Sequence, residues 1–195
     1  MMRKRVGNKE QAILDAAVKV FALHGYHHAK ISTIADQAGV ATGSVYLYYK
    51  NKEGILLTIF DRLWAELTEG LRVIVKRSDI DATQKLDLVI DKLFELFIAN
   101  PALASVFVNE QQHLIKERRG NIARQYDDFL NLAEEIIREG VRENKFHPDV
   151  DIKLFRQFIT GGLRSVLLLW SEKSQTLTLH RVRQNVKYFI KHGLL

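Results

Sequence analysis

The chain has 195 residues, of which 47% are hydrophobic and only 2 are proline, so it can bury a sizeable core and favours long helices. It contains no cysteine, which excludes disulfides, Cys-ligated zinc and thiol chemistry, and no run of 18 apolar residues, which excludes a membrane-spanning helix. The net charge of +6 gathers at one end, because residues 1–52 hold 8 Lys and Arg against 3 Asp and Glu; this end is either a phosphate-binding region or a solubilising tail.

The first quarter of the chain is predicted to form three short helices. Apolar residues at 3.6-residue spacing predict the first helix over about residues 8–23. Ser32 and Thr33 open the second, where a hydroxyl can cap free N–H groups, and Gly39 makes a tight turn before the third begins near Thr42. Two short helices joined in this way are typical of a helix-turn-helix, whose second helix enters the DNA major groove.

The third predicted helix carries hydroxyls, a glycine and tyrosines where a surface helix would ordinarily carry Glu and Lys. Gly43 permits close approach to the floor of the groove, and the hydroxyls of Thr42 and Ser44 can bind base edges or phosphates. Tyr46 and Tyr48 lie about 200° apart around the helix, so they cannot both face the core. At least one of these tyrosines is therefore expected to reach phosphate oxygens.

Longer helices are predicted in the rest of the chain. Residues 52–76 carry a continuous apolar stripe, and Asn51 is a suitable cap for them. Further helices are expected over about residues 84–99, 102–114, 150–173 and 178–191. Another ends near residue 143, and residues 118–121 are either a basic linker before it or its first turn. The prediction is an all-α protein of about nine helices, with a three-helix helix-turn-helix domain at residues 1–52 and a larger helical effector-binding and dimerisation domain at residues 53–195.

One segment resembles the signature of the TetR family of bacterial repressors, and the resemblance runs from Ile13 to about Leu56. The matching pattern is Ile34-Ala35-x-x-Ala38-Gly39-Val40-x-x-Gly43-x-Val45-Tyr46-x-Tyr48-Tyr49-x-x-Lys52-Glu53. The resemblance implies base contacts from Thr42 and Gly43, backbone contacts from the later positions, and an inward-facing Tyr49. The candidate DNA-binding residues are Ser32, Thr33, Thr42, Gly43, Ser44, Tyr46, Leu47, Tyr48 and Lys52. Ala41 stands where the family usually has a capping Ser or Thr, so Thr42 is expected to take over capping.

The last two predicted helices carry apolar stripes that suit a dimer interface. One small DNA-binding domain grips few base pairs, so two copies on a two-fold operator are expected. Gly161-Gly162 lies within a helix, where each glycine costs about 1 kcal/mol against alanine, and a close helix–helix approach would offset that cost. The resemblance implies a four-helix bundle between protomers; alternatively, the stripes close the monomer core. The candidate interface residues are Phe155, Gly162, Val166, Trp170, Val182, Val186 and Phe189.

Aromatic residues in the middle and late helices indicate either an apolar effector cavity or ordinary core packing. The candidate lining residues are Trp64, Phe94, Phe97, Phe107, Phe129 and Phe158. The chain is most similar to acyl-CoA-responsive regulators of fatty-acid degradation, which implies that Arg118 and Arg119, with Lys116 and Arg124, meet the CoA phosphates; a solvated linker is the alternative. Residues 109–113 lack the arginine typical of that subgroup, so a drug-sensing repressor of an efflux gene remains the other possibility.

Motifs of catalysis and metal binding are absent from the sequence. It contains no P-loop, GxGxxG, HExxH or GxSxG pattern, and its 7 histidines are scattered. We therefore expect no metal, no cofactor and no enzyme activity, with a small helical enzyme as the rival class. The sequence predicts a cytoplasmic, homodimeric repressor that binds double-stranded operator DNA, responds to a small apolar effector and does not enter membranes.

Overall fold

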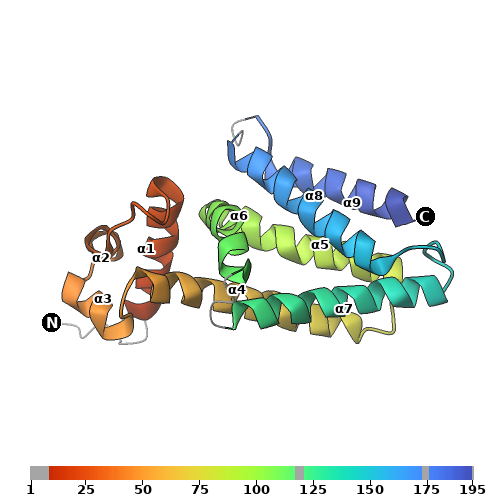
Figure 1. The fold of residues 1–195 in the computed structure, drawn as a ribbon, viewed down its shortest axis with the longest axis horizontal. Helices are drawn as coiled ribbons and strands as arrows, with labels where there is room; N and C mark the ends of the chain where they lie inside the picture. The colour runs from red at the N-terminus through yellow and green to blue at the C-terminus, as the bar shows by residue number, and fades with distance from the viewer. Residues whose placement is uncertain (1–8, 117–120, 173–175, 195) are drawn as a thin grey trace.

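The computed structural model describes residues 9–116, 121–172 and 176–194 of the chain (Figure 1). The described residues form helices and connecting turns, which confirms the all-α prediction. Nine helices occur among them: α1 (Lys9–His24), α2 (Ile31–Ala38), α3 (Thr42–Tyr48), α4 (Lys52–Val75), α5 (Ala82–Ala99), α6 (Pro101–Lys116), α7 (Ile122–Arg142), α8 (Ile152–Glu172) and α9 (Leu179–Leu194). Most of the predicted boundaries lie within one or two residues of these bounds.

Helices α1–α3 form a small head at one end of the molecule (Figure 1). Its core is built from small and branched apolar residues, including Ile13, Ala17, Ile34, Ala35 and Val45, each of which is fully buried. The turn between α2 and α3 depends on a glycine in the left-handed conformation, which side chains other than glycine rarely adopt (Gly39, φ 66°). The predicted helix-turn-helix is therefore present.

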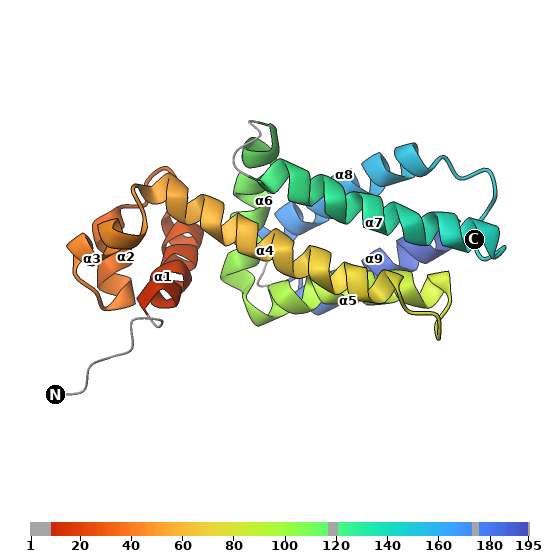
Figure 2. The same cartoon turned by 90° about the horizontal axis from the view of Figure 1, so that it is seen from below.

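The long helix α4 leads from the head into the body of the protein (Figure 2). It starts where predicted, because the side chain of Asn51 accepts a hydrogen bond of 2.9 Å from the backbone N–H of Gly54 and so caps its first turn. Its apolar stripe is buried against α5 and α7, while its first half also packs on α1. One helix thus belongs to the cores of both the head and the body.

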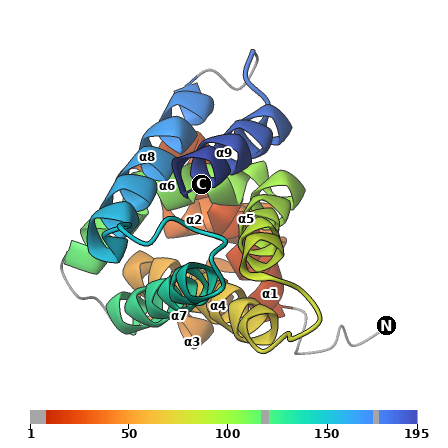
Figure 3. The same cartoon turned by 90° about the vertical axis from the view of Figure 1, so that its right-hand side faces the viewer.

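The body consists of stacked helices with α8 and α9 on its outer side (Figure 3). Viewed along the long axis, α4 and α7 lie on the opposite side, with α5 and α6 between. A buried ion pair fixes part of this arrangement: the Nζ atom of Lys85 lies 2.6 Å from Oε1 of Glu139 and donates to the carbonyl of Val75 at 3.1 Å. These contacts tie the end of α4 to α5 and α7.

Candidate functional site

The outward surface of α3 is the candidate DNA-reading surface. Thr42, Gly43 and Leu47 are exposed, and Tyr46 is 55% exposed, whereas Ser44 is half-buried. A Cβ atom built on Gly43 would meet no described atom within 4 Å, so no other part of the described chain covers this position. The helix therefore presents a glycine, two hydroxyl-bearing residues and a tyrosine to solvent at the end of the head.

Two predictions about helix caps in the head are wrong. Helix α2 begins at Ile31 after Lys30, so Ser32 and Thr33 lie inside its first turn, with Ser32 exposed and Thr33 half-buried. Helix α3 begins after Ala41 without a side-chain cap, and the side chain of Thr42 makes no hydrogen bond with any other described residue. Because the hydroxyl of Thr42 is not used for capping, it stays available to a ligand outside the chain.

The two tyrosines at the end of α3 and just after it pack toward the core to different depths. Tyr48 is half-buried and packs against the core, whereas the neighbouring Tyr49 is buried and donates from its hydroxyl to Oε1 of Glu10 at 3.1 Å. Burial and the negative charge of Glu10 raise the pKa of Tyr49 to about 12. Arg62 holds the same Glu10 carboxylate at 2.6 Å, so α1, α4 and the end of α3 are joined. The inward position expected for Tyr49 is confirmed.

Lys52 has a different environment from the one expected for a phosphate-binding residue. Its Nζ atom donates to the backbone carbonyls of Tyr26, His27 and Ala29 at 2.9, 2.7 and 3.4 Å. The same ammonium lies 4.8 Å from the centre of the Tyr26 ring, within the range of a cation–π interaction. The side chain therefore closes the α1–α2 turn onto the start of α4, and its three donors are engaged by the protein itself.

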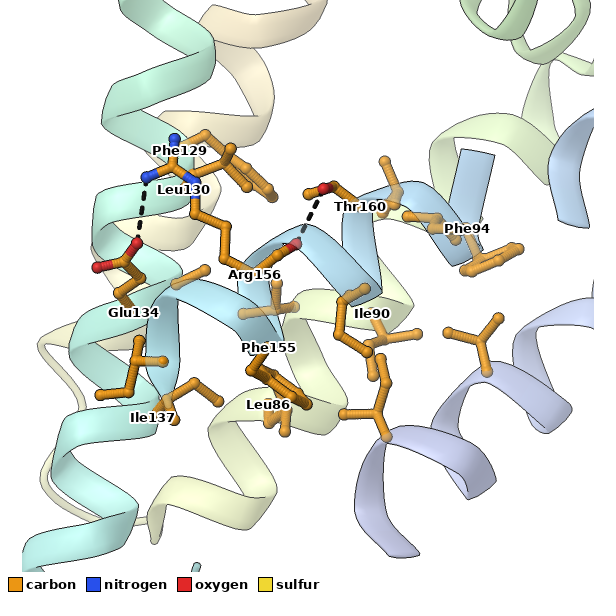
Figure 4. Close-up of a pocket in the computed structure, with 18 residues that line it drawn as sticks. Leu86, Ile90, Phe94, Phe129, Leu130, Glu134, Ile137, Phe155, Arg156 and Thr160 are labelled. Carbon is orange, nitrogen blue, oxygen red and sulfur yellow. Dashed lines mark hydrogen bonds and ion pairs between the residues drawn. The ribbon is translucent and has the colours of Figure 1, made fainter. Parts of the chain in front are cut away.

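An almost entirely apolar cavity of about 120 Å³ lies between α5, α7, α8 and α9, and we name it the apolar cavity (Figure 4). Of the described residues that line it, Glu134, Arg156 and Thr160 are the polar ones. Arg156 binds Glu134 at 3.1 Å and Asp127 at 3.0 Å, while the hydroxyl of Thr160 donates to the carbonyl of Arg156 at 2.9 Å. Because these polar groups already have partners, the space suits a hydrocarbon chain.

A second cavity of about 330 Å³ adjoins the first and has a mixed lining; we name it the mixed cavity. The two cavities share part of their lining, namely Leu93, Phe129, Leu130, Thr160 and Leu163. The mixed cavity adds Trp64 from α4 and Gln111 from α6, together with Gln157 and Arg164 from α8. An elongated ligand could therefore place an apolar portion in one cavity and a polar portion in the other.

The aromatic residues predicted to line a pocket occupy different positions. Phe94 lines the apolar cavity, Trp64 and Phe107 line the mixed cavity, and Phe129 lines both. Phe97 lies in the core behind Phe107, with ring centroids 5.0 Å apart.

Phe158 must be reassigned, because its side chain is 77% exposed on α8 and lines neither cavity. Arg118 and Arg119 lie outside the described residues, as does the side chain of Lys116, whereas Arg124 is exposed at the start of α7. The sequence prediction missed Gln157 and Arg164, although their seven-residue spacing places them on one face of α8.

The outer face of α8 and α9 exposes large apolar side chains. These are Leu154, Phe158, Leu169, Tyr188 and Phe189, with exposures from 44% to 77%. On α8 they follow helical spacing and flank Gly161 and Gly162, and a Cβ atom on either glycine would meet no described atom within 4 Å. Gly161 also lines the mixed cavity, whereas no described part of the chain accounts for Gly162.

The predicted interface residues fall on both sides of these two helices. Gly162 and Phe189 are exposed on the outer face, and Val166 is half-buried. The remaining four point inward, which differs from the predicted interface position. Trp170 and Val182 are buried in the core of the chain, while Phe155 and Val186 line the apolar cavity. Burial against the rest of the body explains their apolar character without a second protomer.

Comparisons with known proteins agree with this geometry. Residues 13–59 match the family profile described as bacterial regulatory proteins of the tetR family, and residues 60–193 match the C-terminal region of YsiA-like proteins. The fatty acid metabolism regulator protein of Bacillus subtilis is 34% identical over 95% of both chains. The repressor KstR2 of Rhodococcus jostii is 25% identical over 93% of this chain and 89% of its own.

Solved structures show the same relationship. The fatty acid degradation regulator FadR from Bacillus halodurans has a TM-score of 0.84 and 34% identity, covering 98% of each chain. FadR from Bacillus subtilis, solved in complex with stearoyl-CoA, has a TM-score of 0.80 and 34% identity, covering 95% of this chain and 99% of that one. Among the helices of the described segments, none is long and apolar enough to cross a membrane. With a helix-turn-helix head, a cavity-bearing helical body and these relatives, the chain belongs to the TetR family of bacterial DNA-binding transcriptional regulators.

Proposed function

We propose that this protein is a dimeric repressor that leaves a palindromic operator when it binds a long-chain acyl-CoA. The observation that carries the proposal is that the apolar cavity adjoins the mixed cavity, whose lining includes the polar residues Gln111, Gln157 and Arg164. It acts in the cytoplasm as a regulator without catalytic activity. The division into a DNA-binding domain at residues 1–52 and an effector domain at residues 53–195 places the boundary at the start of α4.

The two cavities match the two chemical parts of an acyl-CoA. Each buried CH₂ group contributes about 0.8 kcal/mol, so every methylene of the acyl chain that enters the apolar cavity would add to the affinity. Arg164 is exposed at the mixed cavity and forms no ion pair with another described residue, which leaves its guanidinium available for a phosphate. The solved FadR of Bacillus subtilis, which is similar over nearly the whole chain, holds stearoyl-CoA.

The DNA-binding part of the proposal rests on the surface of α3. Thr42 and Gly43 would approach bases, while Tyr46, Leu47 and Tyr48 would meet the phosphate backbone. Ser32 and Thr33, in the first turn of α2, complete the proposed contact surface. A head of this size covers one half-site, so two heads are needed about 34 Å apart in successive major grooves.

The second protomer would dock on the exposed apolar face of α8 and α9. Phe158 on α8 and Phe189 on α9 are large apolar side chains that are 77% and 67% exposed, and exposed apolar groups of this kind mark protein–protein contacts. Gly161 and Gly162 are exposed on α8 and a Cβ atom on either would meet no described atom within 4 Å, so they would permit two α8 helices to approach closely. Such a contact explains why these two glycines are tolerated within a helix.

The switch would act through α4, which packs in both the head and the body. Trp64 on α4 lines the mixed cavity, so a ligand there touches the helix that carries the head. The ligand releases DNA only if it binds more tightly to the arrangement in which the two heads no longer fit successive grooves.

The proposal is tested by measuring release from DNA. A duplex selected from random sequence by the protein is labelled, and fluorescence anisotropy is followed as acyl-CoA of increasing chain length is added, with CoA alone and the free fatty acids as controls. We expect release by long-chain acyl-CoA and weaker release by the fatty acids. Replacing Arg118 and Arg119 with Ala should weaken this response without weakening DNA binding. Release by neutral or cationic drugs, with none by any acyl-CoA, would instead assign the protein to drug sensing.

A further inference from the structure

The indole of Trp64 is a buried donor that the described chain leaves unsatisfied. The residue is only 2% exposed, and its ring packs against those of Phe107, Tyr126 and Phe129. Its Nε1 atom is buried and has no hydrogen-bond partner among the described residues. Buried polar groups are nearly always paired in native proteins, so this N–H calls for an acceptor.

Trp64 also lines the mixed cavity, so a bound ligand can approach its side chain. The aromatic rings around the indole make a poor environment for an ionised carboxylate, because a charge removed from water needs a compensating charge nearby. A neutral carbonyl oxygen avoids that cost and still accepts a hydrogen bond. The surroundings of Trp64 therefore favour an uncharged acceptor.

The position of Trp64 relative to the two cavities indicates which carbonyl this is. The ring of Phe129, which lines both cavities, lies 5.4 Å from that of Trp64 between centroids. An alkyl chain that runs from the apolar cavity to the mixed cavity would pass Phe129, which lines both. The first acceptor on an acyl-CoA after its alkyl chain is the oxygen of the thioester carbonyl.

We propose that Trp64 recognises the thioester: its indole N–H donates to the thioester carbonyl oxygen of acyl-CoA, while the CoA arm leaves past Gln157 and Arg164. This inference rests on the proposed function and adds the residue that distinguishes a thioester from a free fatty acid. Because Trp64 belongs to α4, the same hydrogen bond connects the ligand directly to the helix that carries the DNA-binding head.

The test compares two ligands that differ in one carbonyl. Hexadecanoyl-CoA and its thioether analogue S-hexadecyl-CoA are titrated calorimetrically into the wild-type protein and into Trp64→Phe, which keeps an aromatic ring but removes the N–H. We expect the wild type to bind the thioester about 10-fold more tightly than the thioether, in line with the loss of one partner of a buried hydrogen bond. Trp64→Phe should bind both ligands equally, and Trp170→Phe, which alters the other tryptophan, should keep the wild-type preference.

A spectroscopic measurement separates this contact from a role in packing. In protein labelled with ¹⁵N-tryptophan, the indole N–H resonance of Trp64, assigned by its loss in Trp64→Phe, should move downfield with hexadecanoyl-CoA and not with S-hexadecyl-CoA. Equal binding of the two ligands to the wild type, or an unchanged preference in Trp64→Phe, would overturn the inference while leaving the proposed function intact. Failure of both ligands to bind the wild type would overturn the two together.

Discussion

Lys52 provides a direct test of whether a charged residue near the DNA-reading surface binds phosphate or holds the protein together. Its ammonium donates to three carbonyls of the α1–α2 turn and lies over the ring of Tyr26. We therefore predict that Lys52→Met lowers the free energy of unfolding, because the turn loses its attachment to α4. The number of phosphates contacted by each head should stay the same.

The expected size of this effect follows from the contacts. A hydrogen bond to a charged group contributes about 1.5–3 kcal/mol when it is buried, but the bond to His27 is exposed and the one to Ala29 is long at 3.4 Å. An exposed cation–π contact adds about 0.5 kcal/mol. We expect a total loss of about 2 kcal/mol, which corresponds to a decrease in Tm of about 4–8 °C for a chain of this length.

The assay combines thermal unfolding followed by circular dichroism with operator binding measured over a series of salt concentrations. A lost phosphate contact would reduce the slope of log affinity against log salt by about 0.9 per contact, whereas a lost structural contact leaves the slope unchanged. Lys50→Met is the matched control, since Lys50 is exposed and carries the same charge nearby. An unchanged Tm together with a flatter salt slope for Lys52→Met would refute the structural role.

Three further substitutions probe other parts of the molecule. Gly162→Leu should weaken the dimer without unfolding the monomer, because the glycine faces open space; sedimentation velocity measures this, and a wild type that is monomeric at micromolar concentration contradicts it. Lys85→Met should lower the free energy of unfolding, measured with urea, by about 3 kcal/mol, because it leaves Glu139 unpaired. Adding Glu139→Gln should restore most of this loss, and an unchanged free energy in Lys85→Met would show that the pair contributes nothing. Burial raises the pKa of Asp61 above 3.8, so the folded state loses stability as the pH rises past that value. Asp61→Asn should therefore stabilise the protein more at pH 7 than at pH 4, and equal effects at both would exclude this cause.

The head was largely predictable from the sequence because its determinants are local. Helical periodicity predicted α1, a glycine in the left-handed conformation ends α2, and Asn51 caps α4 as expected. The inward position of Tyr49 also followed from the family pattern. The role of Lys52 did not, because its acceptors lie 23 to 26 residues earlier in the chain and only the folded head brings them together.

The orientation of α8 and α9 could not be predicted with the same success. Both faces of α8 are apolar, with Phe155 turned toward the cavity and Phe158 toward solvent, so periodicity alone does not tell which face the body covers. Arg164 was missed for a related reason. Its position in the helix carries no local sign of function until packing of α4, α7 and α8 brings Trp64, Phe129 and Arg164 to the lining of one cavity.

The two cavities also bear on how long the regulator survives inside a cell. Any ligand that binds only the folded state stabilises it, by about 2.7 kcal/mol at a concentration one hundred times its Kd, and unfolded molecules are the ones that proteases remove. Filling the apolar and mixed cavities would therefore protect the protein from degradation while it is off the DNA. A ligand that lifts repression would at the same time preserve the stock of repressor, which is then ready to bind DNA again once that ligand is gone.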